Sequence, residues 1–314
     1  MRVPHLSPIA DRRVTIVAAI LVAVIIVTGG AVRLSDSGLG CPSWPNCASG
    51  QLTAHAQSDS HQWIESLNRM FTGLVSVAVI VAVLGSLVRV PKRMDLVWLS
   101  VGLVAGVFAQ AVLGGLTVLF DLKPGFVMAH FLLSIVLLTD ALVLVRRAGQ
   151  PDAPAHAQPV VTHRTVTLGR ALFVLAGAVL VTGTVVTGAG PHSGGGKQHD
   201  VSRFDLRIPD VARVHGTTVM VFLAAVLAMV WLVRRDRAPH QVQQRVTVLL
   251  VVLVAQAAVG YVQYFNNIPA VLVGVHIAGA TAVWSATVVL YLGFFERRID
   301  TPIAPRADSL LAPA

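Results

Sequence analysis

Eight apolar segments, each close to the length that crosses a membrane, restrict the fold of this chain more than any other feature. They cover residues 14–32, 66–88, 96–120, 125–145, 168–188, 211–233, 246–264 and 268–295. A helix needs about 20 apolar residues to cross a hydrocarbon core. Only 12% of the residues are charged, against about 25% in soluble domains. We therefore expect an all-α integral membrane protein with eight transmembrane helices.

Basic residues concentrate in alternate segments between the apolar runs. The N-terminus, 89–95, 146–167, 234–245 and the C-terminus, with the adjoining helix ends, hold 17 of the 24 Lys and Arg residues. The positive-inside rule then places both termini in the cytoplasm, as in a multi-pass protein of the cell membrane. This distribution accounts for the net charge of +9, so we do not expect nucleic-acid binding.

The sequence also repeats itself. Gln110 precedes His130 by 20 residues, and Gln256 precedes His276 by the same interval. Nearer the N-terminus, VTGG at 27–30 matches VTGT at 181–184, and between these two matched regions Asn68 aligns with His215. We predict two four-helix halves, residues 1–155 and 160–314, with an outer loop at 33–65 and a disordered tail after 298. An even number of spans gives both halves the same orientation, so an axis along the membrane normal relates them.

His130, His215 and His276 lie inside apolar spans. A polar residue at that depth indicates function, although a lone histidine is more often a core residue bonded to a neighbour. The second and fourth helices of an up-down bundle lie diagonally opposite. His215 and His276 therefore face each other, as two axial ligands of haem iron do. Three glycines are expected to leave room for the macrocycle: Gly216, Gly274 and Gly279.

The first half places His130 opposite Asn68, which is a poor iron ligand, so a haem bound there keeps one open axial face. Glu65 lies one turn before Asn68 on the same helical face. It is either a general base or charge stabiliser or only a favourable charge at a helix N-terminus. Arg69 and Arg213 lie beside the ligand positions, where they pair with haem propionates or only snorkel to the interface.

Both cysteines, Cys41 and Cys47, fall in the first outer loop, in the segment CPSWPNC. The outer side of the membrane is oxidising, which favours a disulfide over two free thiols. Two cysteines alone do not make a structural zinc site, because that site takes four ligands.

These residues together resemble haem A synthases of the Gram-positive or actinobacterial type. The runs GGAVRLSDSGLGCPSWPNC and WIESLNRMFTG and the in-span histidines carry the resemblance, which covers nearly the whole chain. It implies an oxidoreductase that converts the C8 methyl group of haem O to a formyl group through a hydroxymethyl intermediate, giving haem A for terminal oxidases.

The same resemblance implies a role for each site residue. His215 and His276 are the axial ligands of haem b, His130 lies on the side of the substrate haem O, and Glu65 is the essential carboxylate. Many members have histidine where this chain has Asn68, so this chain keeps a single histidine on the substrate side.

Two other functions also fit the residues. One is a b-type cytochrome that passes electrons, for example from quinol, without modifying haem, and the other is a haem carrier. The carboxylate of Glu65 and the asymmetry between the two halves favour the enzyme. The expected partners are the haem O synthase that farnesylates haem, an electron acceptor that the sequence does not identify, and membrane lipid. The sequence leaves open whether the chain forms a homo-oligomer.

Overall fold

The computed structural model describes residues 5–41, 43–47, 50–55, 58–152, 155–195 and 199–299. Eight helices lie within these ranges, and all of them are long and apolar enough to cross a membrane. They are α1 (Pro8–Leu34), α2 (Ser60–Val88), α3 (Met94–Leu119), α4 (Pro124–Ala148), α5 (His163–Ala189), α6 (Ile208–Arg235), α7 (His240–Phe265) and α8 (Ala270–Leu292). The predicted all-α membrane fold is confirmed.

Several helices begin before the apolar runs because polar residues cap them. The Ser7 side chain accepts a hydrogen bond from the Ala10 amide, and Pro8 occupies the start of α1. Both residue types are favoured at these positions. Asp59 and Thr162 cap α2 and α5 in the same way. Caps of this kind extend the helices beyond the apolar runs without adding apolar residues.

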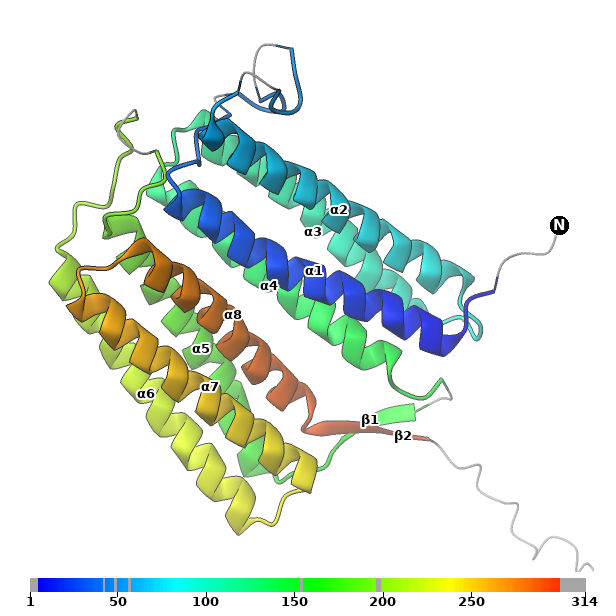
Figure 1. Ribbon diagram of the computed structural model, residues 1–314. Coiled ribbons are helices and arrows are strands. Elements are labelled where there is room, and N and C mark those ends of the chain that lie inside the picture. Colours follow the sequence, from blue (N-terminus) through cyan, green and yellow to red (C-terminus); the bar gives the residue numbers. More distant parts are fainter. Residues whose placement is uncertain are drawn as a thin grey trace, which may run out of the picture.

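The helices pack as two groups of four, α1–α4 and α5–α8, which lie side by side (Figure 1). The groups meet through α1, α4, α5 and α8. Gln110 Nε2 donates to the His130 carbonyl oxygen at 3.1 Å, and Gln256 Nε2 donates to the His276 carbonyl oxygen at 2.8 Å. One hydrogen bond thus recurs at matched positions of the repeat.

The apolar interior runs through both groups. Leu138, Phe222 and Leu249 are fully buried, and the Trp284 indole of α8 donates to the Thr139 hydroxyl of α4 at 2.9 Å. Large apolar side chains such as Val271, which is 78% exposed, cover the outside. An apolar outer surface of this kind is expected of a membrane-spanning protein.

A short β-ladder closes one end of the molecule (Figure 1). Strand β1 (Ala155–Pro159) pairs antiparallel with β2 (Phe295–Ile299), with Ala155 opposite Ile299. Disorder was expected after 298, but Ile299 belongs to β2, and the rest of that tail lies outside the described residues. The ladder ties the segment between the two groups to the C-terminal segment, at the end where α1 begins.

Buried ion pairs hold the same end together. Arg89 Nε lies 3.1 Å from Asp11 Oδ2, and both side chains are fully buried. A second nitrogen of Arg89 lies 2.7 Å from Asp152 Oδ1. Burial alone would lower the pKa of Arg93, but its hydrogen bond and ion pair with Asp95 raise that pKa above the usual value. These contacts connect the start of α1 to the segments that follow α2 and α4.

Candidate functional site

A cavity of about 1340 Å³ extends through both helix groups. Pockets for a single small molecule measure about 300–1,000 Å³, so this cavity has room for more than one ligand. The predicted site residues that line it are Glu65, Asn68, Arg69, His130, Arg213, His215 and His276. The structure therefore brings together, along one cavity, every predicted site residue except the two cysteines.

His215 on α6 and His276 on α8 face each other across the second group. Their ring centres lie 6.4 Å apart, and the rings are close to perpendicular, at 72°. Metal–imidazole bonds are about 2 Å long, so two rings on opposite sides of one metal ion have their centres roughly 6 Å apart. The spacing of this pair therefore fits two axial ligands of one haem iron.

Thr182 on α5 orients His215. The Thr182 hydroxyl oxygen lies 3.1 Å from His215 Nδ1, and the same hydroxyl donates its hydrogen to the Ala178 carbonyl oxygen at 2.9 Å. A hydroxyl has one hydrogen to donate, so it accepts the hydrogen bond from Nδ1–H. This tautomer leaves the lone pair of Nε2 for a metal ion.

Each of the three histidines packs against a glycine of the preceding helix. A Cβ atom would lie 3.2 Å from His130 Cε1 at Gly114, 3.1 Å from His215 Cε1 at Gly183, and 3.0 Å from His276 Cε1 at Gly260. Any side chain at these positions would press on the imidazole. The three glycines therefore set the position of each ring.

The glycines expected to make room behave differently from one another. Gly216 faces open space, whereas a Cβ at Gly279 would lie 1.8 Å from Gln256 Oε1. Gly279 therefore makes room for Gln256 rather than for a macrocycle. The sequence analysis missed the three contact glycines and Thr182. The repeat does contain a signal for two of these glycines, since Gly114 and Gly260 each precede their histidine by 16 residues.

The first group lacks the second imidazole. His130 Nδ1 and Asn68 Oδ1 are buried and have no hydrogen-bond partner among the described residues. A Cβ at Gly29, which matches Gly183 in the repeat, would have nothing within 4 Å. The shorter Asn68 therefore leaves space where the second group holds His215.

Glu65 binds the disulfide loop as well as lining the cavity. It is 5% exposed. Its Oε2 accepts a hydrogen bond from the Cys41 amide at 2.8 Å, and its Oε1 accepts one from Arg69 at 2.6 Å. Arg69 also donates to the carbonyl oxygens of Cys41, Ser43 and Asn46. The Glu65–Arg69 pair thus joins α2 to the loop.

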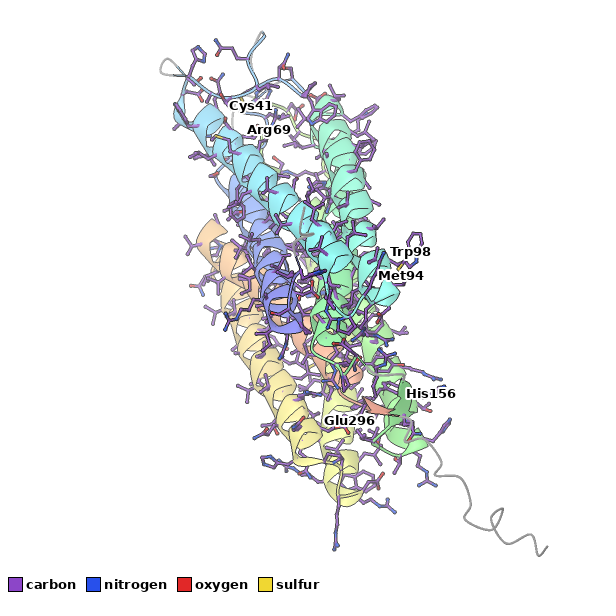
Figure 2. All side chains as sticks on the ribbon, turned by 90° about the vertical axis from the view of Figure 1, so that its right-hand side faces the viewer. Cys41, Arg69, Met94, Trp98, His156 and Glu296 are labelled. Carbon is purple, nitrogen blue, oxygen red and sulfur yellow. A yellow bond between two sulfur atoms is a disulfide. The ribbon has the colours of Figure 1, made fainter. Side chains whose placement is uncertain are left out.

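The predicted disulfide is confirmed: Cys41 and Cys47 are bonded, and both are fully buried. Trp44, between them, lines the cavity and packs against Gly115 of α3, where a Cβ would lie 2.7 Å from its ring. Cys41 and Arg69 lie together at the end of the molecule opposite Glu296 (Figure 2). The loop therefore covers the first group at the end away from the ladder.

Arginines around the cavity differ in their contacts. The Arg213 side chain is 78% exposed, and its nearest carboxylate, that of Asp210, is 3.9 Å away. Arg33, which the sequence analysis did not single out, lines the cavity and donates to the His192 and Thr187 carbonyl oxygens at 2.8 and 3.1 Å. Arg33 thereby joins α1 to the end of α5.

The fold and the site define a class: a polytopic membrane protein of two repeated four-helix groups, with histidines facing an intramembrane cavity. Residues 12–191, more than half of the chain, match the model of the COX15-CtaA family, described as "Cytochrome oxidase assembly protein". The chain belongs to this family.

Curated relatives carry the name "Heme A synthase". The protein from Listeria welshimeri is 26% identical over 264 residues, which cover 80% of this chain and 85% of the relative. The protein from Shewanella oneidensis is 30% identical over 188 residues, covering 54% of each chain. The similarity to the first of these extends over most of both chains.

Proposed function

We propose that this chain is a haem A synthase, an oxidoreductase that oxidises the C8 methyl group of haem O to a formyl group. The observation that carries the proposal is the asymmetry of one cavity. One helix group presents two facing histidines, and the matched positions of the other present Asn68 and His130. The name shared by the relatives supports this function over that of a simple b-type cytochrome.

The second group is proposed to hold haem b as the resident cofactor, and His215 and His276 are the side chains that would bind its iron. The ring spacing and the oriented tautomer of His215 fit this role. Bound there, haem b supplies one-electron transfer beside the substrate. Thr182, Gly183 and Gly260 hold the two imidazoles in place.

The first group is proposed to bind haem O. His130 is its one imidazole, and the space beside Gly29 and Asn68 keeps the opposite side accessible. A product must leave this site, and a single strong ligand opposes its release less than two. Arg69 and Arg213 were both predicted to pair with haem propionates. Arg69 already donates hydrogen bonds to carbonyl oxygens of the disulfide loop, so the exposed Arg213 is more available to bind a propionate.

Glu65 is proposed to accept a proton during the oxidation. The first step converts the methyl group and one water molecule to hydroxymethyl, and the second converts hydroxymethyl to formyl. Each step releases two electrons, which pass to the external acceptor, and two protons. A carboxylate in the cavity wall is placed to take one of these protons. Each of its oxygens accepts a hydrogen bond, and a carboxylate has about four lone-pair sites, so lone pairs remain for a proton.

The proposed orientation comes from the distribution of basic residues, which places both termini in the cytoplasm. In that orientation, the disulfide loop and the histidine end of the cavity lie on the outer side. The substrate is apolar and is proposed to come from the haem O synthase within the membrane. The electrons pass to an acceptor outside this chain.

Extraction of haems tests the proposal. The full chain is expressed in a membrane host that makes haem O but not haem A, and the extracted haems are separated with mass detection. We expect haem A or its hydroxymethyl precursor. A known synthase in the same host is the positive control. Haem B bound without any oxidised haem O, while that control makes product, would favour the electron carrier instead.

A further inference from the structure

A second hollow of about 510 Å³ lies at the ladder end, where the two helix groups meet. Its wall comes from the end of α4, the start of α7 and strand β2. Its polar lining includes Arg146, His240, Gln241, Arg245, Glu296 and Arg297. None of the residues assigned to haem belongs to this set.

The charge of this hollow is mostly positive. Arg146, Arg245 and Arg297 line it, against the single carboxylate of Glu296. Arg12 adds a further cation at the rim, because its guanidinium packs against Gly149, where a Cβ would lie 2.9 Å from Arg12 Nε. Like charges gathered in one hollow repel each other, so an anion bound among them would stabilise the arrangement.

Two of these arginines have donors to spare. Arg146 donates one hydrogen bond to the Phe295 carbonyl oxygen at 3.0 Å, but its buried Nε has no partner within the described ranges. A buried donor without a partner in a native protein calls for an explanation, such as a bound ion. Arg245 packs over Gly293, and across the described residues no hydrogen bond or ion pair involves its guanidinium.

Helix α7 adds to the positive potential. Its N-cap position is Pro239, and no side chain caps it. The free amides and the dipole of a helix N-terminus favour an anion. The first turn of α7 lines the hollow through His240 and Gln241, so the helix and the arginines act on the same space.

We propose that this hollow binds the phosphate headgroup of an anionic phospholipid, between the two helix groups. Basic pockets between transmembrane helices on the cytoplasmic side bind such headgroups. Arg146 directly follows the fourth apolar run and Arg245 directly precedes the seventh. Both guanidinium groups are therefore rooted where the hydrocarbon ends and lipid phosphates begin.

The surface beside the hollow favours a lipid over free phosphate. Val248 and Val251 follow Arg245 on α7 at successive helical turns and are 54% and 62% exposed. Residues three apart are neighbours on a helix surface, so an acyl chain can lie along these valines while the headgroup contacts Arg245. Free phosphate would gain nothing from this apolar stripe.

Lipid binding to the purified full chain tests the proposal. Native mass spectrometry of the detergent-solubilised protein is titrated with phosphatidylglycerol and, separately, with phosphatidylcholine. We expect phosphatidylglycerol to bind about tenfold more tightly or better, since each arginine near a lipid surface contributes substantially to anionic-lipid affinity. Arg146→Gln/Arg245→Gln should remove that preference, and Arg146→Lys/Arg245→Lys should retain most of it.

The matched control is Arg164→Gln/Arg234→Gln, which removes the same charge from exposed positions near the ends of α5 and α6. It should keep the preference. If the Arg146→Gln/Arg245→Gln protein does not stay monodisperse, Arg245→Gln alone serves, and it should weaken phosphatidylglycerol binding severalfold. Equal loss in the control variant, or an unchanged preference in the hollow variants, would overturn the proposal.

Inorganic phosphate separates the two sources of the anion. At millimolar concentration it should not displace phosphatidylglycerol from the protein. Displacement would show a site for free phosphate and refute the lipid assignment. The measurement needs neither haem nor turnover, so its result is independent of the proposed synthase activity.

Discussion

The Thr182 hydroxyl and His215 Nδ1 are hydrogen-bonded at 3.1 Å, and this contact orients one of the two facing imidazoles. Partners of this kind fix the tautomer of a metal-ligating histidine, and their loss typically costs about 10–100-fold in metal affinity or activity. The matched residue of the first group, Thr28, donates to the Ile25 carbonyl oxygen instead. Both groups thus keep the threonine, but only one uses it on a histidine.

Thr182→Val tests this relationship. The substitution removes the hydroxyl and nearly preserves the volume, so we expect a folded protein with a lower content of haem b and a shifted reduction potential. Haem content and a redox titration measure the two effects. Thr218→Val is the control, because the Thr218 hydroxyl donates to the Val214 carbonyl oxygen and its side chain is not part of the cavity wall. Equal behaviour of both variants would remove Thr182 from the site.

Asn68→His tests the open side of the first group. Gly29 leaves the space for an imidazole, and Thr28 occupies the position that matches Thr182 in the repeat. We expect the variant to bind the substrate haem more firmly and to turn over more slowly, since product release is opposed by a second ligand. Extracted haems and a low-spin absorption signal measure retention. Faster product formation would contradict this account of Asn68.

Gly260→Ala tests the contact that positions His276. The added Cβ would lie 3.0 Å from His276 Cε1, so the ring must shift, and haem b content should fall severalfold. Gly177→Ala is the matched control, because its Cβ would have nothing within 4 Å. Alanine is favoured over glycine in a helix, so the control should retain its haem and lose no stability.

Glu65→Gln separates proton transfer from loop attachment. Glutamine still accepts a hydrogen bond from the Cys41 amide but loses the ion pair with Arg69 and the capacity to accept a proton. We expect haem A formation to fall at least about 100-fold, in the range of a lost general base. Cys41→Ser/Cys47→Ser, which frees the loop and keeps the carboxylate, should lose much less. An equal loss in both would assign Glu65 to the loop alone.

The helices could be predicted because each apolar run is close to the length of a membrane-spanning helix. The ladder was not, because Ala-His-Ala-Gln-Pro lacks the β-branched and aromatic residues that mark strands. Its partner, β2, lies more than a hundred residues further along the chain. Local composition carries no trace of such a pairing.

The site was predictable where the repeat doubled the signal. Matched intervals singled out His130 and His276 and, through Asn68, His215. The spacing of Glu65 and Asn68 placed both on one helical face, but it did not place Glu65 and Arg69 against the disulfide loop. That attachment depends on where the Cys41, Ser43 and Asn46 backbone groups turn, and backbone direction in an irregular loop is not encoded in residue type.

Asp11→Asn tests what the buried ion pairs contribute to stability. Asp11 and Arg89 have fully buried side chains 3.1 Å apart, and removing one partner of a buried pair leaves an uncompensated charge that costs about 3–5 kcal/mol. We expect a clear drop in the melting temperature of the detergent-solubilised protein. The remaining contact of Arg89 with Asp152, at 2.7 Å, should keep the loss toward the lower end.

Asp210→Asn is the control, since Asp210 is exposed and its ion pairs span 3.8 and 3.9 Å. Exposed pairs contribute about 0–1 kcal/mol, so its melting temperature should stay close to that of the unmodified chain. A similar drop in both variants would mean that the ladder end is not held by its buried charges.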